Sequence, residues 1–69
     1  MSRIVNIHCK PSLLDDIKSE GLGYSWSQQL DEIDVLVEDI MDLEDDQLCE
    51  HYGLDYDQVN CVEAHNFVA

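Results

Sequence analysis

The sequence has very few basic residues, and it has none in its larger, second part. Arg3, Lys10 and Lys18 are the only Lys or Arg residues, against sixteen Asp or Glu, and the formal net charge is −13. Residues 21–69 hold thirteen acidic residues and no basic one. Such a surface repels nucleic acid and anionic membranes and attracts basic proteins. We therefore expect no direct binding to nucleic acid or to a membrane.

Long apolar runs are also lacking. The apolar run at residues 4–7 is too short for a signal peptide, and no stretch of eighteen apolar residues could span a bilayer. Cysteine is scarce and odd in number, with Cys9, Cys49 and Cys61, so any pairing would leave one thiol over. An odd count is typical of a reducing compartment. We expect a protein of the cytoplasm, in the cytosol of a host cell.

The remaining composition indicates one folded unit. A chain of 69 residues that is 45% apolar predicts a single small domain over residues 1–69. Residues 3–9 are rich in β-branched side chains and predict a short strand. The only weak candidate for a partner strand is 23–27. We therefore predict a mainly α fold, a small helical domain of three to four helices with a short N-terminal extended strand.

Helix signals follow along the chain. Ser12 and Gly21 bound a short helix at 11–21, and Gly53 ends another at 44–52. The central prediction is a helix over 26–42, opened by a capping box at residues 25–28. Its apolar positions recur every three or four residues, which is typical of an amphipathic helix with Leu36 in the core. They are Leu30, Ile33, Val37, Ile40 and Met41. Asp55 would cap a last helix that runs to about residue 66 and has Phe67 on its apolar side.

Residues 45–64 resemble a helix-turn-helix. Cys49 is the small residue of the first helix and Gly53 is the turn glycine four positions later. Leu48, Tyr52, Leu54, Val59 and Val62 fall on its apolar positions. The resemblance implies a second helix that enters the DNA major groove by its N-terminal residues. Those residues here are acidic and would oppose phosphates, so we expect a structural helix pair that does not bind DNA.

Three other kinds of site use acidic or metal-binding residues: a catalytic site, a calcium site and a zinc site. A domain of this size leaves little room for a catalytic carboxylate cleft, and we expect no enzyme and no cofactor. An EF-hand loop fails because Gln47 stands where glycine is needed. A zinc site is the more specific alternative, since cysteine and histidine, which bind zinc in proteins, both occur in the second half of the chain. The candidate ligands are Cys49, His51, Cys61 and His65, with His8 and Cys9 as spare ligands.

The acidic residues of 31–57 favour a protein-binding function. Rows of carboxylates on a helix offer negative charge at a spacing comparable to that of DNA phosphates. In size and composition the chain resembles the small acidic inhibitors of bacteriophages and mobile elements, of anti-restriction and anti-CRISPR type, many of which mimic DNA. This resemblance implies a basic nucleic-acid-binding host protein as the partner. The expected contacts are Asp31, Asp34, Glu38, Asp42, Asp45, Asp46, Asp55, Tyr56 and Asp57.

Two alternatives compete with mimicry. One is a small zinc-binding module. The other is an acidic interaction or assembly protein, with a possible homodimer through the strand at residues 3–9.

Overall fold

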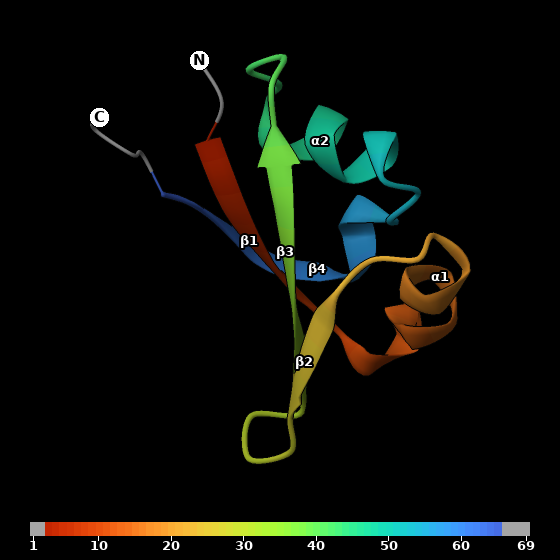
Figure 1. The fold of residues 1–69 in the computed structure, drawn as a ribbon. Coiled ribbons are helices and arrows are strands. Elements are labelled where there is room, and N and C mark those ends of the chain that lie inside the picture. The colour runs from red at the N-terminus through yellow and green to blue at the C-terminus, as the bar shows by residue number, and fades with distance from the viewer. Residues whose placement is uncertain (1–2, 66–69) are drawn as a thin grey trace.

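The protein is built on a four-stranded antiparallel sheet, seen in a computed structural model that describes residues 3–65 (Figure 1). The strands are β1 (Arg3–Cys9), β2 (Tyr24–Ser27), β3 (Glu32–Asp39) and β4 (Val59–His65), in the order β2-β3-β1-β4. Two short helices, α1 (Leu14–Ser19) and α2 (Asp45–His51), connect them. Single 3-10 turns precede α1 (η1, Pro11–Leu13) and β4 (η2, Tyr56–Gln58). The prediction of a mainly α domain is therefore wrong.

The topology consists of two interleaved β-α-β units. β1 is antiparallel to both of its neighbours, β3 and β4, and β2 is antiparallel to β3. It follows that β1 and β2 run parallel with β3 between them, and that β3 and β4 run parallel with β1 between them. The β-α-β-β-α-β order is that of the ferredoxin-like, split βαβ arrangement.

The segment predicted as the long helix, 26–42, is instead β2, a tight turn and β3. Along β3, Ile33, Val35 and Val37 are buried, and the residues between them face the other side of the sheet. The alternation of buried and outward-facing residues along β3 therefore decides the structure, and not the helical spacing of three and four residues. β-branched side chains at alternate positions pack well on a pleated sheet. Leu36 falls on the outward face and is 61% exposed, so its predicted place in the core is wrong.

The core lies between one face of the sheet and the two helices, which lie on the same side of it (Figure 1). β1 contributes Val5, Ile7 and Cys9, all fully buried, and the same alternation continues on β3. The connections and helices close the core from the other side with Leu13, Ile17, Leu48, Cys49 and Leu54. The opposite face of the sheet carries no helix and is called the open face below.

The helix-turn-helix resemblance fails after its first helix. α2 ends at His51, and Gly53 adopts the positive φ of 74° that a helix-ending glycine allows. Asp55 caps the next turn as predicted, since its side chain accepts a hydrogen bond from the Asp57 amide. That turn, η2, is only three residues long and leads into β4 instead of a helix. Asn66 and Phe67, assigned to the last helix, lie outside the described residues.

Other local predictions are confirmed. Residues 3–9 form the predicted strand, and the two short helices lie within 11–21 and 44–52. β2 was not predicted, since residues 23–27 were only a weak strand candidate and the predicted helix began at residue 26. Gly21, with a φ of 69°, follows the end of α1. Ser12 does not cap that helix, because its hydroxyl donates to Gln58 Oε1 at 2.8 Å. No helix in the described part of the chain is long and apolar enough to cross a membrane.

The position of β1 bears on the predicted homodimer. β1 pairs with β3 along one edge and with β4 along the other. It therefore has no free backbone edge for a strand from a second copy. A homodimer through residues 3–9 stays a prediction, and it would need the side chains of β1 instead of its edges.

Candidate functional site

The predicted contact residues are spread over several surfaces instead of one helix. Asp34 and Glu38 lie on the open face of β3, and Asp31 and Asp42 lie in the turns before and after that strand. Eight residues of β3 at about 3.3 Å each place these two turns roughly 25 Å apart. Asp45 and Asp46 form the first turn of α2, and Asp55, Tyr56 and Asp57 belong to η2.

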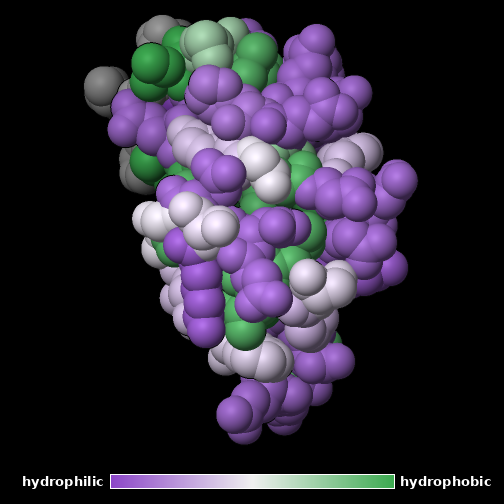
Figure 2. Space-filling model, turned by 90° about the vertical axis from the view of Figure 1, so that its right-hand side faces the viewer, coloured by the Kyte–Doolittle hydropathy of each residue, from purple (hydrophilic) through white to green (hydrophobic). Residues whose placement is uncertain are grey.

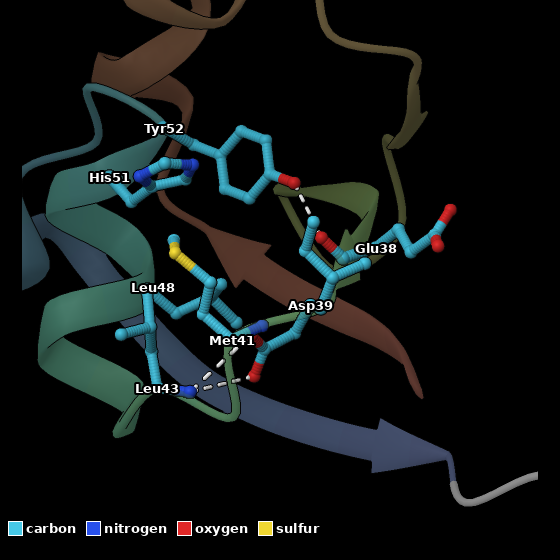
Figure 3. A pocket seen from close by; sticks show the side chains of 8 residues that line it. Glu38, Asp39, Met41, Leu43, Leu48, His51 and Tyr52 are labelled. Carbon is cyan, nitrogen blue, oxygen red and sulfur yellow. Dashed lines mark hydrogen bonds between the residues drawn. The ribbon is translucent and has the colours of Figure 1, made fainter. Parts of the chain in front are cut away.

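One of the predicted residues, Glu38, lines a hollow between β3 and α2 (Figure 3), and three more lie in the segments that border it. The β3–α2 hollow has a volume of about 440 Å³. Glu38 lines it, Asp42 is in the turn that forms one side, and Asp45 and Asp46 open the helix that forms the other. The remaining lining residues are Asp39, Ile40, Met41, Leu43, Leu48, His51 and Tyr52.

Asp39 holds the turn that shapes the hollow. Its carboxylate accepts hydrogen bonds from the Met41 amide at 3.2 Å and the Leu43 amide at 3.1 Å. Behind it, Arg3 Nε donates to Asp39 Oδ2 at 3.0 Å and Arg3 Nη2 donates to the Leu43 carbonyl at 2.8 Å. Burial raises the pKa of Asp39, but the hydrogen bonds from Arg3, Leu43 and Met41 outweigh it and hold the pKa below 3.8. The carboxylate is therefore ionised at neutral pH.

The centre of the hollow is apolar and accessible. Ile40 is 70% exposed and Met41 is 54% exposed, although the sequence pattern assigned both to the core. On the helix side, the Tyr52 hydroxyl donates to the Glu38 carbonyl at 2.6 Å, and the ring of Tyr52 meets that of His51 edge to face. These contacts fix the wall formed by α2. Sequence reasoning missed this apolar centre because it followed the wrong period.

Acidic residues are frequent in the segments that border the hollow, but of the acids only Glu38 and Asp39 line it, and the Glu38 carboxylate points away from it (Figure 3). Residues 38–51 include seven acidic side chains and no Lys or Arg. The one guanidinium nearby, that of Arg3, is already engaged by Asp39. Figure 2 shows the helix-bearing side of the molecule, where hydrophilic side chains dominate and hydrophobic ones surface in patches, one of them at the upper end, the level of the β3–α2 turn in Figure 1.

The η2 residues form a separate acidic surface. Tyr56, one of the expected contacts, stands between two acids and is 43% exposed. Asp55 Oδ1 is occupied by the Asp57 amide at 3.1 Å. None of these three residues lines the β3–α2 hollow.

The four candidate zinc ligands are not brought together. Cys49 is fully buried between α2 and the sheet, whereas Cys61 is exposed on the open face. The sheet lies between the two thiols, so they cannot hold one ion. His51 is exposed on α2, and the side chain of His65 lies outside what the structure describes. Burial, together with the charges of Asp45 and Asp46, raises the pKa of Cys49 to about 11.

Comparison of the chain with protein-family models, with curated proteins and with solved structures gave no match.

Proposed function

We propose that this protein is an acidic inhibitor that binds a basic nucleic-acid-binding protein and occupies its nucleic-acid site. The observation that supports the proposal best is the β3–α2 hollow, whose apolar centre lies between the turn that holds Asp42 and the first turn of α2, with Asp45 and Asp46. The net charge of −13 adds long-range attraction for a basic surface, which raises the rate of encounter at low salt.

The hollow suits the two parts of a Lys or Arg side chain. The charged heads of the partner would meet the exposed carboxylates of Asp42, Asp45 and Asp46 beside the hollow in charge-assisted hydrogen bonds. Their aliphatic stems would lie on Met41 and Ile40, which are accessible at the centre. A nucleic-acid-binding surface presents the same side chains to phosphates, so it cannot hold nucleic acid and this protein at the same place.

The size and acidity that the chain shares with small phage-encoded inhibitors of anti-restriction and anti-CRISPR type support the same class of function. A host nuclease or other nucleic-acid-binding protein of basic surface is the kind of partner we propose.

The test is competition on a purified partner. Proteins captured on the immobilised chain are eluted with duplex DNA, and an eluted protein is purified. Its affinity for DNA is then measured at increasing concentrations of this protein and at several salt concentrations. Mimicry requires that the two ligands exclude each other and that the complex weakens as salt rises. If the partner binds both at once with unchanged affinities, site occupancy is rejected.

A matched pair of variants locates the surface. Asp45→Lys with Asp46→Lys reverses the charge at the first turn of α2, and Asp15→Lys with Asp16→Lys does the same at the first turn of α1. Both variants change the net charge equally and place lysines at the start of a helix, which costs about 0.3–1 kcal/mol each through the helix dipole. We expect the α2 variant to lose affinity more than tenfold and the α1 variant to lose much less. Equal losses would mean that only the overall charge matters.

A further inference from the structure

The open face of the sheet carries a compact group of titratable side chains around His8, on the side away from the helices. His8 is on the central strand, and the sheet register places Asp34 of β3 directly beside it on one side and Cys61 of β4 on the other. Glu32 and Glu63 reach the same ring from neighbouring positions on those strands. We call these five residues the His8 cluster. No residue that lines the β3–α2 hollow belongs to it.

One ring nitrogen of His8 is held by two carboxylates. Nδ1 lies 2.6 Å from Asp34 Oδ1 and 2.8 Å from Glu32 Oε1. Carboxylate oxygens at neutral pH only accept hydrogen bonds, so Nδ1 must carry a proton. Glu32 is itself held in place, because Asn60 Nδ2 donates to its other oxygen at 2.9 Å. This arrangement fixes both the ring orientation and the tautomer.

The other ring nitrogen is left without a partner. Nε2 is buried and makes no hydrogen bond to any described residue. The nearest carboxylate oxygen, Oε1 of Glu63, is 3.6 Å away, too far for a hydrogen bond. With the proton on Nδ1, a neutral ring turns the Nε2 lone pair towards a carboxylate. A buried lone pair that faces negative charge is unfavourable unless a cation lies between them.

The groups around Nε2 form the donor set of a transition-metal site. Ligand atoms of His8, Cys61 and Glu63 all lie within 4.8 Å of one another. Imidazole nitrogen, thiolate sulfur and carboxylate oxygen are the three ligand types that zinc takes in proteins, at about 2.0–2.3 Å from the ion. Small rotations of Cys61 and Glu63, which are both exposed, bring their donors to such distances. Asp34 and Glu32 then supply the carboxylate partner that usually orients a metal-bound histidine.

We propose that His8 Nε2, Cys61 Sγ and the Glu63 carboxylate bind a divalent transition metal of the zinc type, with water as the fourth ligand. On binding, the Cys61 thiol loses its proton to solvent, and a lone pair of the resulting thiolate sulfur forms the bond to the ion. Burial and the charges of Glu32, Glu63 and Asp34 raise the pKa of the Cys61 thiol, so the proton is present before the ion arrives. The site is independent of the inhibitor function proposed above, because it lies on another face and uses other residues.

The competing occupant of Nε2 is a proton. Burial lowers the pKa of His8, but the hydrogen bond and charge of Asp34, followed by those of Glu32, outweigh it and raise the pKa above 6.5. A protonated ring would bridge Asp34 and Glu63 without any metal. The two occupants differ in one respect that can be measured, because only the metal recruits the Cys61 sulfur.

Titration with Co²⁺, followed by optical absorption in the presence of a non-thiol reductant, tests the site. We expect one equivalent of Co²⁺ to produce a thiolate-to-cobalt charge-transfer band with the intense visible bands of a four-coordinate ion, and Zn²⁺ to abolish both. Cys61→Ser, an exposed substitution that leaves the core intact, should remove the charge-transfer band and weaken Co²⁺ binding at least tenfold. Glu63→Gln should weaken binding, while its matched control Glu50→Gln, on α2, should not.

His8→Asn tests the imidazole, with circular dichroism to verify that the sheet is retained. If that variant unfolds, Cys61→Ser and Glu63→Gln still decide the question. Binding that lacks a thiolate band, that survives Cys61→Ser, or that Mg²⁺ displaces as readily as Zn²⁺ would assign the ion to the acidic surface in general and overturn the proposal. None of these results depends on whether a basic partner binds the β3–α2 hollow.

Discussion

Asp39 is the charged side chain that the described part of the chain buries most completely, at 2% exposure. Most acidic residues here repel one another, yet this one accepts four hydrogen bonds from the turn that follows it and from Arg3. Arg3 is one of only three basic residues in the chain. Its position explains why the N-terminal strand and the β3–α2 turn depend on each other.

Stability should therefore depend on the charge of Asp39. Its pKa is lower in the folded protein than the 3.8 of an ordinary aspartate, so the folded state binds fewer protons than the unfolded chain. The resulting stabilisation is fully present above pH 3.8 and is lost as the pH falls through the folded pKa. We expect Asp39→Asn to lower the free energy of unfolding at neutral pH, and the difference from the unsubstituted protein to shrink below pH 3.8.

Urea denaturation across that pH range measures the difference. Glu38→Gln is the matched control, because it removes the same charge from the adjacent, exposed residue. A Glu38→Gln effect as large as that of Asp39→Asn would show that loss of surface repulsion, and not the buried carboxylate, controls the response.

The three thiols differ in burial, since Cys9 and Cys49 are buried and Cys61 is exposed. Burial raises the pKa of Cys9 to about 12 and that of Cys49 to about 11, and both side chains are fully buried. Thiolates are the reactive form, so neither should react in the native protein. We expect a thiol-specific reagent to modify Cys61 alone in native protein and all three cysteines in denaturant. Rapid modification of Cys49 would contradict the packing of α2 against the sheet.

At the scale of elements, the segment 26–42 shows where sequence reasoning failed. Leu30, Ile33, Val37 and Ile40 fit a helical stripe, but Ile33, Val35 and Val37 fit a strand equally well. The deciding signal was Val35, which has no place on the helical stripe and is fully buried on β3. β-branched residues at alternate positions should have carried more weight than the spacing of three and four.

Paired substitutions on β3 distinguish the two assignments. Val35→Asp would bury a carboxylate without a partner, at a cost of several kcal/mol, which is a large part of the stability of a small domain. Leu36→Asp would place the same group on the open face at a position that is 61% exposed. We expect Val35→Asp to unfold the protein and Leu36→Asp to leave it folded, as judged by circular dichroism and urea denaturation. If residues 26–42 formed a helix with Leu36 in the core, Leu36→Asp would unfold the protein instead.

The candidate site was predictable only in part, for the same reason. Glu38, which lines the hollow, and Asp42, Asp45 and Asp46, which lie in the segments that border it, were named from the charge pattern alone, since charge requires no knowledge of the fold. Its apolar centre was missed because Ile40 and Met41 were placed in a core that does not exist. Of the His8 cluster, Cys61 was named as a candidate zinc ligand and His8 as a spare one, but their grouping with Glu63 was missed, since these residues come from strands whose register cannot be obtained without the sheet order.

At the scale of the whole molecule, charge opposes folding. Thirteen net negative charges are held within a radius of gyration of 11.5 Å, comparable to the Debye length of about 10 Å at 0.1 M salt. Folding brings these charges closer together than they are in the expanded chain. Repulsion between these charges therefore destabilises the folded state most at low ionic strength.

We expect thermal and urea stability to rise with salt, and to rise alike in sodium chloride and choline chloride if screening is the cause. The variant Asp15→Lys with Asp16→Lys, which is less negative, should show a weaker dependence. A stability that responds to sodium but not to choline would indicate bound cations in place of screening.

The central position of β1 also has a consequence for the growing chain. β1 is synthesised first, but one of its two edges is completed by β4, the last strand of the sheet. Pairings between such distant segments form slowly, because a long loop has to close before they contribute. Throughout that interval an edge containing Ile4, Val5 and Ile7 keeps unpaired backbone N–H and C=O groups, which can accept a strand from any neighbouring chain. The time between the synthesis of β1 and that of β4 is therefore the period in which this protein is most exposed to mispairing on the ribosome.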